Sequence, residues 1–193
     1  MGLNNFSKAA ALHCFEEEPV GKEAEGVVRY WLSLWRGDAL PRRADFSPRQ
    51  IVDQLPNIAI FEIVPDQSIR CRLAGSHIVE GAGLDITGKD ILALTPLAER
   101  PIRLSRFSTI ARGAIGRGLR PGFRDSGEAQ FAEEIMLPFG DVSASGARQV
   151  LVHIDWRQTA FNPTRVGIEN TSGLSHEVRL TPLQAGVPIQ AVA

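Results

Sequence analysis

The sequence lacks most features of a disulfide-stabilised, secreted or membrane-spanning protein. It has two cysteines in 193 residues, Cys14 and Cys71, and no CxxC spacing joins them. No apolar run approaches the roughly 20 residues of a membrane-spanning helix. The N-terminus has one lysine and a short alanine patch before three glutamates, which makes a poor signal peptide. We therefore expect a cytoplasmic protein in which Cys71, on the apolar side of its strand, is a buried and reduced thiol.

A strong charge of either sign is also missing. The formal net charge is −1, which argues against nucleic acid or an anionic membrane as a partner. Arginine is locally enriched, with seven arginines and no acid between Arg100 and Arg124. We expect solvated side chains on a helix surface here, and the alternative is docking of an acidic partner surface or an anionic ligand.

Catalytic and metal-binding motifs are absent from the sequence as well. The four histidines, His13, His77, His153 and His176, show no HxH or HxxxH spacing. There is no GxSxG or GxxxxGK[ST] motif. Glu133 and Glu134 are adjacent on an expected strand and therefore point to opposite faces, which does not suit a catalytic carboxylate pair. The sequence predicts neither an active site nor a metal site.

The length and the ordinary composition, with 44% hydrophobic and 22% charged residues, suit one globular domain with extensions. We expect a leader at residues 1–22 with a short helix over Ser7–Glu17, a domain at residues 23–157, and a tail at residues 158–193 that contributes at most a short strand or helix. Apolar residues at helical spacing predict helices over Lys22–Arg36, Pro48–Leu55 and Pro96–Gly116. Alternating residues predict strands over Asn57–Val64, Ile69–Ala74, Gly118–Arg124, Ala129–Phe139 and Gln149–Arg157.

This order predicts an α+β fold with a five-stranded antiparallel sheet, helices on one face, and an added N-terminal amphipathic helix. The segment Arg70–Asp90 combines a strand, a short helical turn that Ser76 would cap, and three glycines within eight residues, so it predicts a tight corner. The corner either encloses a small cavity or fills a core.

Several short motifs around this corner resemble one known family. They are LPRRADFSP at Leu40–Pro48, the Leu55–Pro56 pair, RLAG at Arg72–Gly75 and LDITGKD at Leu84–Asp90. Their order and spacing resemble a bacterial family of single-domain PAS proteins, PAS family five, over roughly Val27 to Arg157. The resemblance implies the same element order as the periodicity does. It says little about a ligand, because PAS domains share a fold and not a bound molecule.

The resemblance also argues against the common PAS cofactors. Haem-binding PAS domains use a histidine on the central helix, and Leu92–Gly118 contains no histidine. Flavin photosensors use a cysteine in an asparagine–cysteine–arginine motif on a helix, whereas Cys71 lies in an expected strand. A cinnamate-type chromophore needs a cysteine that the helical region lacks. A small organic ligand, such as a fatty or carboxylic acid, or no ligand at all stays open.

Four residues are our candidates for ligand contact: Arg72, His77, Phe107 and His153. Arg72 is interpreted as a buried ion-pair partner or a ligand-anchoring cation. His153 is interpreted as a hydrogen-bonded structural histidine or as a residue that lines a cavity. Trp31 and Trp35 pack either on the domain's own sheet or in a dimer seam, and Arg103 and Arg106 are candidates for contact with a partner.

The leading hypothesis is a stand-alone PAS sensory or regulatory module that acts through a homodimer or an unknown signalling protein, with a ligand or partner contact changing the packing of the Lys22–Arg36 helix. One alternative is a dimerisation or interaction module with a filled core and no ligand. The second is a small α+β-cone enzyme of the isomerase or dehydratase type, for which His153 and Asp155 would supply the acid–base pair. A bell-shaped pH profile of turnover, lost on His153→Ala, would identify the enzyme.

Overall fold

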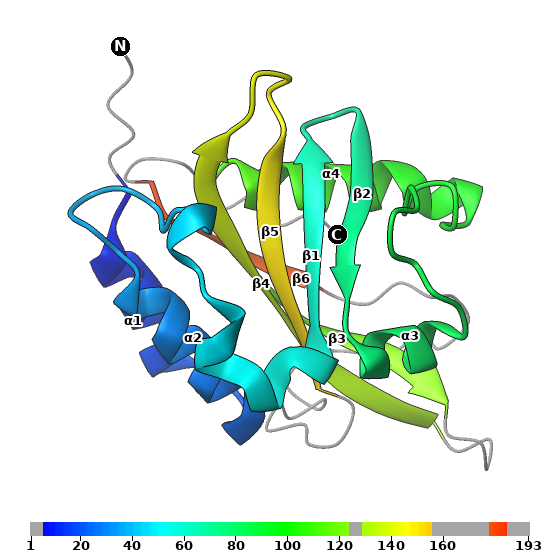
Figure 1. The fold of residues 1–193 in the computed structure, drawn as a ribbon, viewed down its shortest axis with the longest axis horizontal. Coiled ribbons are helices and arrows are strands. Elements are labelled where there is room, and N and C mark those ends of the chain that lie inside the picture. The colour runs from blue at the N-terminus through cyan, green and yellow to red at the C-terminus, as the bar shows by residue number, and fades with distance from the viewer. Residues whose placement is uncertain (1–5, 124–128, 156–177, 185–193) are drawn as a thin grey trace.

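A six-stranded antiparallel sheet in the order β2-β1-β5-β4-β3-β6 runs through the middle of the molecule (Figure 1). The structure, a computed structural model, describes residues 6–123, 129–155 and 178–184. Its strands are β1 (Ile58–Val64), β2 (Ser68–Ala74), β3 (Ala114–Phe123), β4 (Ala129–Val142), β5 (Arg148–Asp155) and β6 (Val178–Pro182). Its helices are α1 (Lys8–Glu17), α2 (Lys22–Ser33), α3 (Ser76–Ala82) and α4 (Arg100–Ala111), with short 3₁₀ segments η1 (Arg43–Asp45), η2 (Pro48–Asn57) and η3 (Leu97–Glu99).

The α+β class and the order of two strands, helices and then three strands are as predicted, but the sheet has six strands and not five. The sixth strand, β6, comes from the predicted tail and pairs with β3, with Gly116 opposite Leu180. The predicted leader also belongs to the fold. Its helix α1 begins after Ser7, whose side chain accepts a hydrogen bond from the Ala10 N–H as a helix N-cap does.

Helices cover both faces of the sheet (Figure 1). We call the face under α3 and α4 the inner face, and the face under α1, α2 and η2 the outer face. The two faces carry separate hydrophobic clusters, one around Ile110 and Met136 and the other around Trp31 and Leu137. The expectation of helices on one face is therefore corrected, because the amphipathic helix α2 and its neighbours form a complete second layer.

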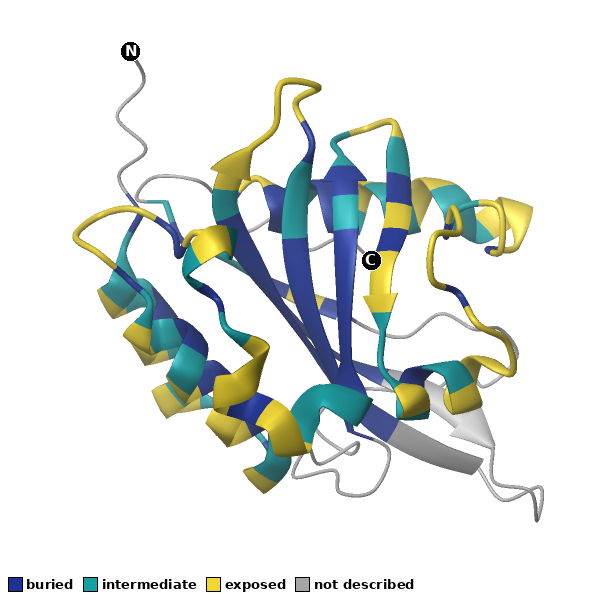
Figure 2. Ribbon diagram, viewed as in Figure 1, coloured by how far each residue is buried: buried dark blue, intermediate teal, exposed yellow. Residues whose placement is uncertain are grey.

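Strand β5 shows how the sequence places side chains on the two faces. Val150, Val152 and Ile154 belong to the inner cluster, whereas Leu151 contacts the outer cluster, as the alternation predicts. Because both faces are covered, the central strands are buried at nearly every position (Figure 2). His153 and Asp155 are buried on the outer face beside Leu151.

The corner at the end of β2 depends on a close approach of two backbones. A Cβ atom at Gly75 would lie 2.1 Å from the Leu55 carbonyl oxygen, so only glycine fits between β2 and η2. Gly75, and not Ser76 as predicted, is the N-cap of α3. The chain then returns along β2, and the Cys71 N–H donates to the Lys89 carbonyl (3.0 Å). The returning segment thereby covers the edge of β2 that pairs with no other strand of the described sheet.

Helix α4 ends earlier than its sequence pattern predicts. The pattern over Pro96–Gly116 continued to Ile115, but α4 ends at Ala111, and Ile115 lies in β3. Gly113 ends the helix with a φ of +117°, and a Cβ atom there would lie 2.1 Å from the Phe6 ring. No helix within residues 6–123, 129–155 and 178–184 is both long enough and apolar enough to cross a membrane.

Candidate functional site

The residues predicted for ligand contact do not lie together. Phe107 packs on the inner face, where its ring stands edge-on to Phe61 with the ring centroids 5.4 Å apart. His153 is buried on the outer face, on the other side of the sheet. No single site therefore includes both residues. A cavity lined by Phe107 would have to lie between α4 and the sheet.

Arg72 and His77 have partners within the chain. Arg72 is exposed on strand β2, and its guanidinium is 2.6 Å from the Glu62 carboxylate. This is the ion-pair interpretation of Arg72, at the surface and not in the core. His77 Nδ1 lies 2.9 Å from Asn57 Oδ1 and joins α3 to the end of η2. Their contact with a ligand stays a prediction.

The two tryptophans of the α2 region are core residues of a single chain. Trp31 has no exposed surface, and its indole N–H donates to the Pro138 carbonyl (3.1 Å). Trp35 stands edge-on to it with the ring centroids 5.5 Å apart. Both rings are buried in the outer cluster against the sheet of their own chain, which is the first of the two placements considered for them, and a dimer seam stays a prediction.

The arginines of the run whose side chains the structure describes, Arg100 to Arg117, do not form one surface, and Arg124 lies outside the described residues. Arg103 donates to Thr95 Oγ1 (2.9 Å), and Arg112 pairs with Asp66. Arg117 does not lie on a solvated helix surface as expected. It lies in β3 and is buried on the outer face. Arg106 is half-buried and has an interaction of its own. Contact of Arg103 and Arg106 with a partner stays a prediction. Arg112 and Arg117 do not belong to such a surface.

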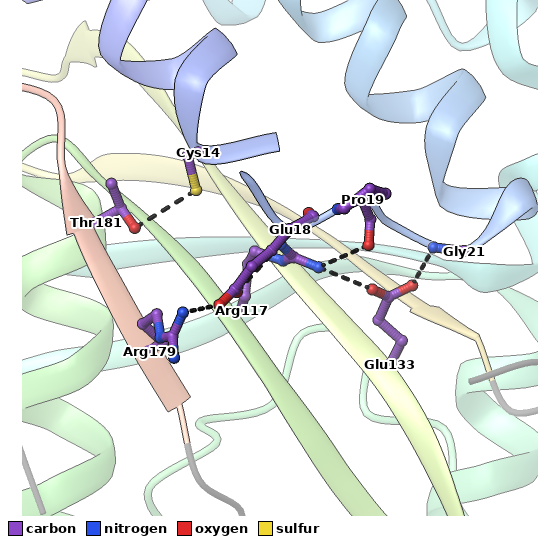
Figure 3. A network of polar contacts seen from close by, with 8 residues as sticks. All are labelled: Cys14, Glu18, Pro19, Gly21, Arg117, Glu133, Arg179 and Thr181. Atoms are coloured by element: carbon purple, nitrogen blue, oxygen red, sulfur yellow. Dashed lines mark hydrogen bonds and ion pairs between the residues drawn. The ribbon is translucent and has the colours of Figure 1, made fainter. Parts of the chain in front are cut away.

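A buried ion pair on the outer face joins the sheet to the N-terminal helices (Figure 3). The Arg117 guanidinium lies 3.3 Å from the Glu133 carboxylate, and these side chains are 4% and 2% exposed. Arg117 also donates to the backbone carbonyls of Glu18 and Pro19, and the Gly21 N–H donates to Glu133 (2.8 Å). We call these five residues the Arg117 cluster.

The Arg117 cluster fixes the connection between α1 and α2. Burial raises the pKa of the Glu133 carboxyl above its ordinary value, although the Gly21 N–H and the Arg117 charge both act to lower it. The Glu18 carboxylate forms a further ion pair with Arg179 of β6. The Arg117 cluster and Arg179 thus bring together residues from the end of α1, from β3, from β4 and from β6. A shift in any of these elements disturbs their polar contacts.

His153 lies in a second buried polar group of the outer face. Its Nε2 lies 3.3 Å from Gln54 Oε1, which can only accept, so Nε2 carries the proton. Nδ1 is buried and has no hydrogen-bond partner among the residues that the structure describes. Burial lowers the pKa of His153 to about 4, against the opposing charges of Asp155 and Glu23. The imidazole is therefore neutral, as expected for a structural histidine.

The Arg117–Glu133 pair is not among the residues predicted from the sequence, although the sequence carries a signal for it. Glu133 alternates with Ile135 and Leu137 on the apolar side of β4, where an unpaired carboxylate would be costly. A cation had to lie opposite it, and Arg117 follows Ile115 at the same spacing on β3. The helical pattern over Pro96–Gly116 continues to Ile115, and it therefore indicates a helix surface for Arg117 instead of this position on β3.

Cys71 gives a direct test of burial on the inner face. It belongs to the inner cluster, and burial raises the pKa of its thiol to about 11. We expect iodoacetamide at pH 8 to alkylate the half-buried Cys14 in the native protein and to leave Cys71 unmodified until the chain unfolds, because the thiolate is the reacting species. Peptide mass spectrometry of both sites checks this, and equal labelling in the native protein would contradict it.

In the described part of the chain, no three His, Cys, Asp or Glu side chains gather as metal ligands.

The fold defines the class of protein: an α+β domain whose antiparallel sheet is interrupted after its second strand by helices. The sequence model of the PAS domain matches residues 22–149, more than half of the chain. The chain belongs to the PAS domain family.

Solved structures with a related arrangement are distant. The PAS domain of BvgS from Bordetella pertussis is 17% identical with a TM-score of 0.39, covering 58% of this chain and 85% of that one. Vibrio cholerae VqmA is 16% identical with a TM-score of 0.38, covering 58% and 53%. The LOV protein of Rhodobacter sphaeroides is 16% identical with a TM-score of 0.34, covering 57% and 66%. Similarity at this level carries no argument about function. A comparison with curated proteins finds no match.

Proposed function

We propose that this chain is a PAS sensory or regulatory module that passes a signal across its sheet to the N-terminal helices. The proposal rests on the Arg117 cluster, which joins the central strands to the α1–α2 connection. Arg117 and Glu133 point to the outer face of the sheet. Their chain neighbours Gly118 and Glu134 pair with each other across β3 and β4. Neighbouring residues of a strand point to opposite faces, so a shift of these two strands changes the packing on the inner face and on the outer face.

The input in this proposal is a small organic ligand on the inner face or a contact with a signalling protein, and a homodimer is the form in which the module works. A catalytic role is not part of the proposal. The acid–base pair considered for an enzyme, His153 and Asp155, is buried beneath the outer layer and not in the space between α4 and the sheet. Such a pair would need access to a substrate.

Mass spectrometry of freshly purified protein, under native and then denaturing conditions, tests the proposal. A small molecule that is present in the native ion at one copy per chain and is released on denaturation supports a sensor and gives the mass of its ligand. An apo ion at the dimer mass removes the ligand and leaves an interaction module. An apo monomer that is unchanged in oligomeric state over the accessible concentrations would contradict both forms of the proposal.

A further inference from the structure

The two helices of the outer layer, α1 and α2, contact the sheet through different kinds of side chains. Helix α2 and the turn directly after it pack on the sheet through apolar side chains, among which Val27 and Trp31 of the helix and Trp35 of the turn are buried. In α1 the only buried residue is Ala11. The contacts of α1 and its end with the sheet include several polar ones: Cys14 Sγ lies 3.4 Å from Thr181 Oγ1, and Glu18 pairs with Arg179 and Arg117.

The N-terminal segment, Phe6–Pro19, is attached next to β3 at both of its ends, and the Phe6 N–H also donates to the Asp38 carbonyl (3.0 Å). At its start, the Phe6 ring covers Gly113, directly before β3, and the Ser7 N–H donates to the Leu183 carbonyl (2.8 Å). At its end, the carbonyls of Glu18 and Pro19 accept from Arg117 within β3. Gly113 also terminates α4, so this segment is attached where the inner-face helix joins the sheet.

We infer that the N-terminal segment opens as a unit of its own, with the chain turning at Gly21, while α2 stays docked. Lifting this segment exposes Phe6, Ala11 and the partly buried Phe15. It also returns the Arg117 and Glu133 charges to water, where these two side chains keep each other as partners. Burial of charged groups is costly, so their return to water offsets part of the lost contact. Lifting α2 together with the turn after it would expose Trp31 and Trp35, and no buried charge would return to water in exchange.

The inference goes beyond the proposed function, because it concerns which segment moves and not which signal moves it. It also changes the expected moving element from the Lys22–Arg36 helix to α1. Opening is a local equilibrium of the apo protein. It is therefore measurable whether or not a ligand is ever found, and a failed ligand search leaves the test unaffected.

Amide hydrogen exchange read by mass spectrometry tests the inference on the full chain. We expect amides of α1 to exchange at least about tenfold faster than those of α2, and Arg117→Met to speed α1 by a further factor of about ten or more, because charged hydrogen bonds to the segment are lost. Arg112→Met is the matched control. It removes an exposed ion pair with Asp66 and is expected to leave α1 unchanged.

A reversible tether supplies the second variant. Cys14 and Thr181 are close enough that Thr181→Cys is expected to form a disulfide that fixes α1 to β6. The oxidised form should exchange slowly in α1, and the same protein after reduction should exchange as fast as the wild type, with α2 equal in both. Equal exchange of α1 and α2 in the wild type would overturn the inference, as would a tether or an Arg117→Met effect that extends equally to α2 and β5.

Discussion

Replacing Trp31 by alanine is expected to lower the free energy of unfolding by about 3–5 kcal/mol. The side chain has no exposed surface, so its removal leaves a large cavity in the outer cluster. Two specific contacts go with it, the hydrogen bond to the Pro138 carbonyl and the edge-on contact with Trp35. Urea unfolding followed by circular dichroism measures the loss without relying on the emission of the residue that was removed.

Trp31→Phe is the matched control, because it keeps most of the apolar volume and loses the indole N–H. Its cost is expected to be smaller than that of the alanine variant. Light scattering of the folded variants decides between core and interface. Loss of stability with unchanged association supports the core position, whereas loss of association with nearly unchanged stability would support the dimer seam that the sequence suggested.

The sequence predicts the central strands well because their residues alternate against two apolar layers. Val150 and Leu151 are assigned to opposite faces correctly for this reason. The sequence does not predict the structure where the neighbours of a residue come from distant segments of the chain. Strand β6 is short and polar at every second position, with Arg179 between Val178 and Leu180, and only its pairing with β3 makes it a strand. Periodicity within five residues does not reveal such a partner.

The candidate site shows the same limit of local patterns. Arg117 and Glu133 are sixteen residues apart and meet only because β3 and β4 pair as a hairpin. Either residue alone resembles a solvated charge. The tryptophans show the converse, since an apolar helix stripe predicts burial but not what covers it. Here the cover is the chain's own sheet.

His153 is expected to make the folded state sensitive to mild acid. Burial lowers the pKa of its imidazole to about 4 in the folded protein, from an ordinary value of 6.5. Between these values the unfolded chain binds a proton that the folded chain does not, so stability falls as the pH falls through this window. The loss between pH 7.5 and pH 5 is about 2 kcal/mol. The raised pKa of Glu133 acts in the opposite direction, because its protonation favours the folded state in acid.

His153→Gln separates the two effects. Glutamine keeps a donor for Gln54 and does not titrate, while Glu133 and the other carboxyl groups stay in both proteins. Urea unfolding of wild type and variant at both pH values gives four free energies, and the wild type should lose about 2 kcal/mol more than the variant on acidification. Equal losses would mean that His153 is hydrated or protonated in the folded state. In that case the cover of η2 over the outer face, on which the assignment of a structural histidine depends, would be looser than the contacts indicate.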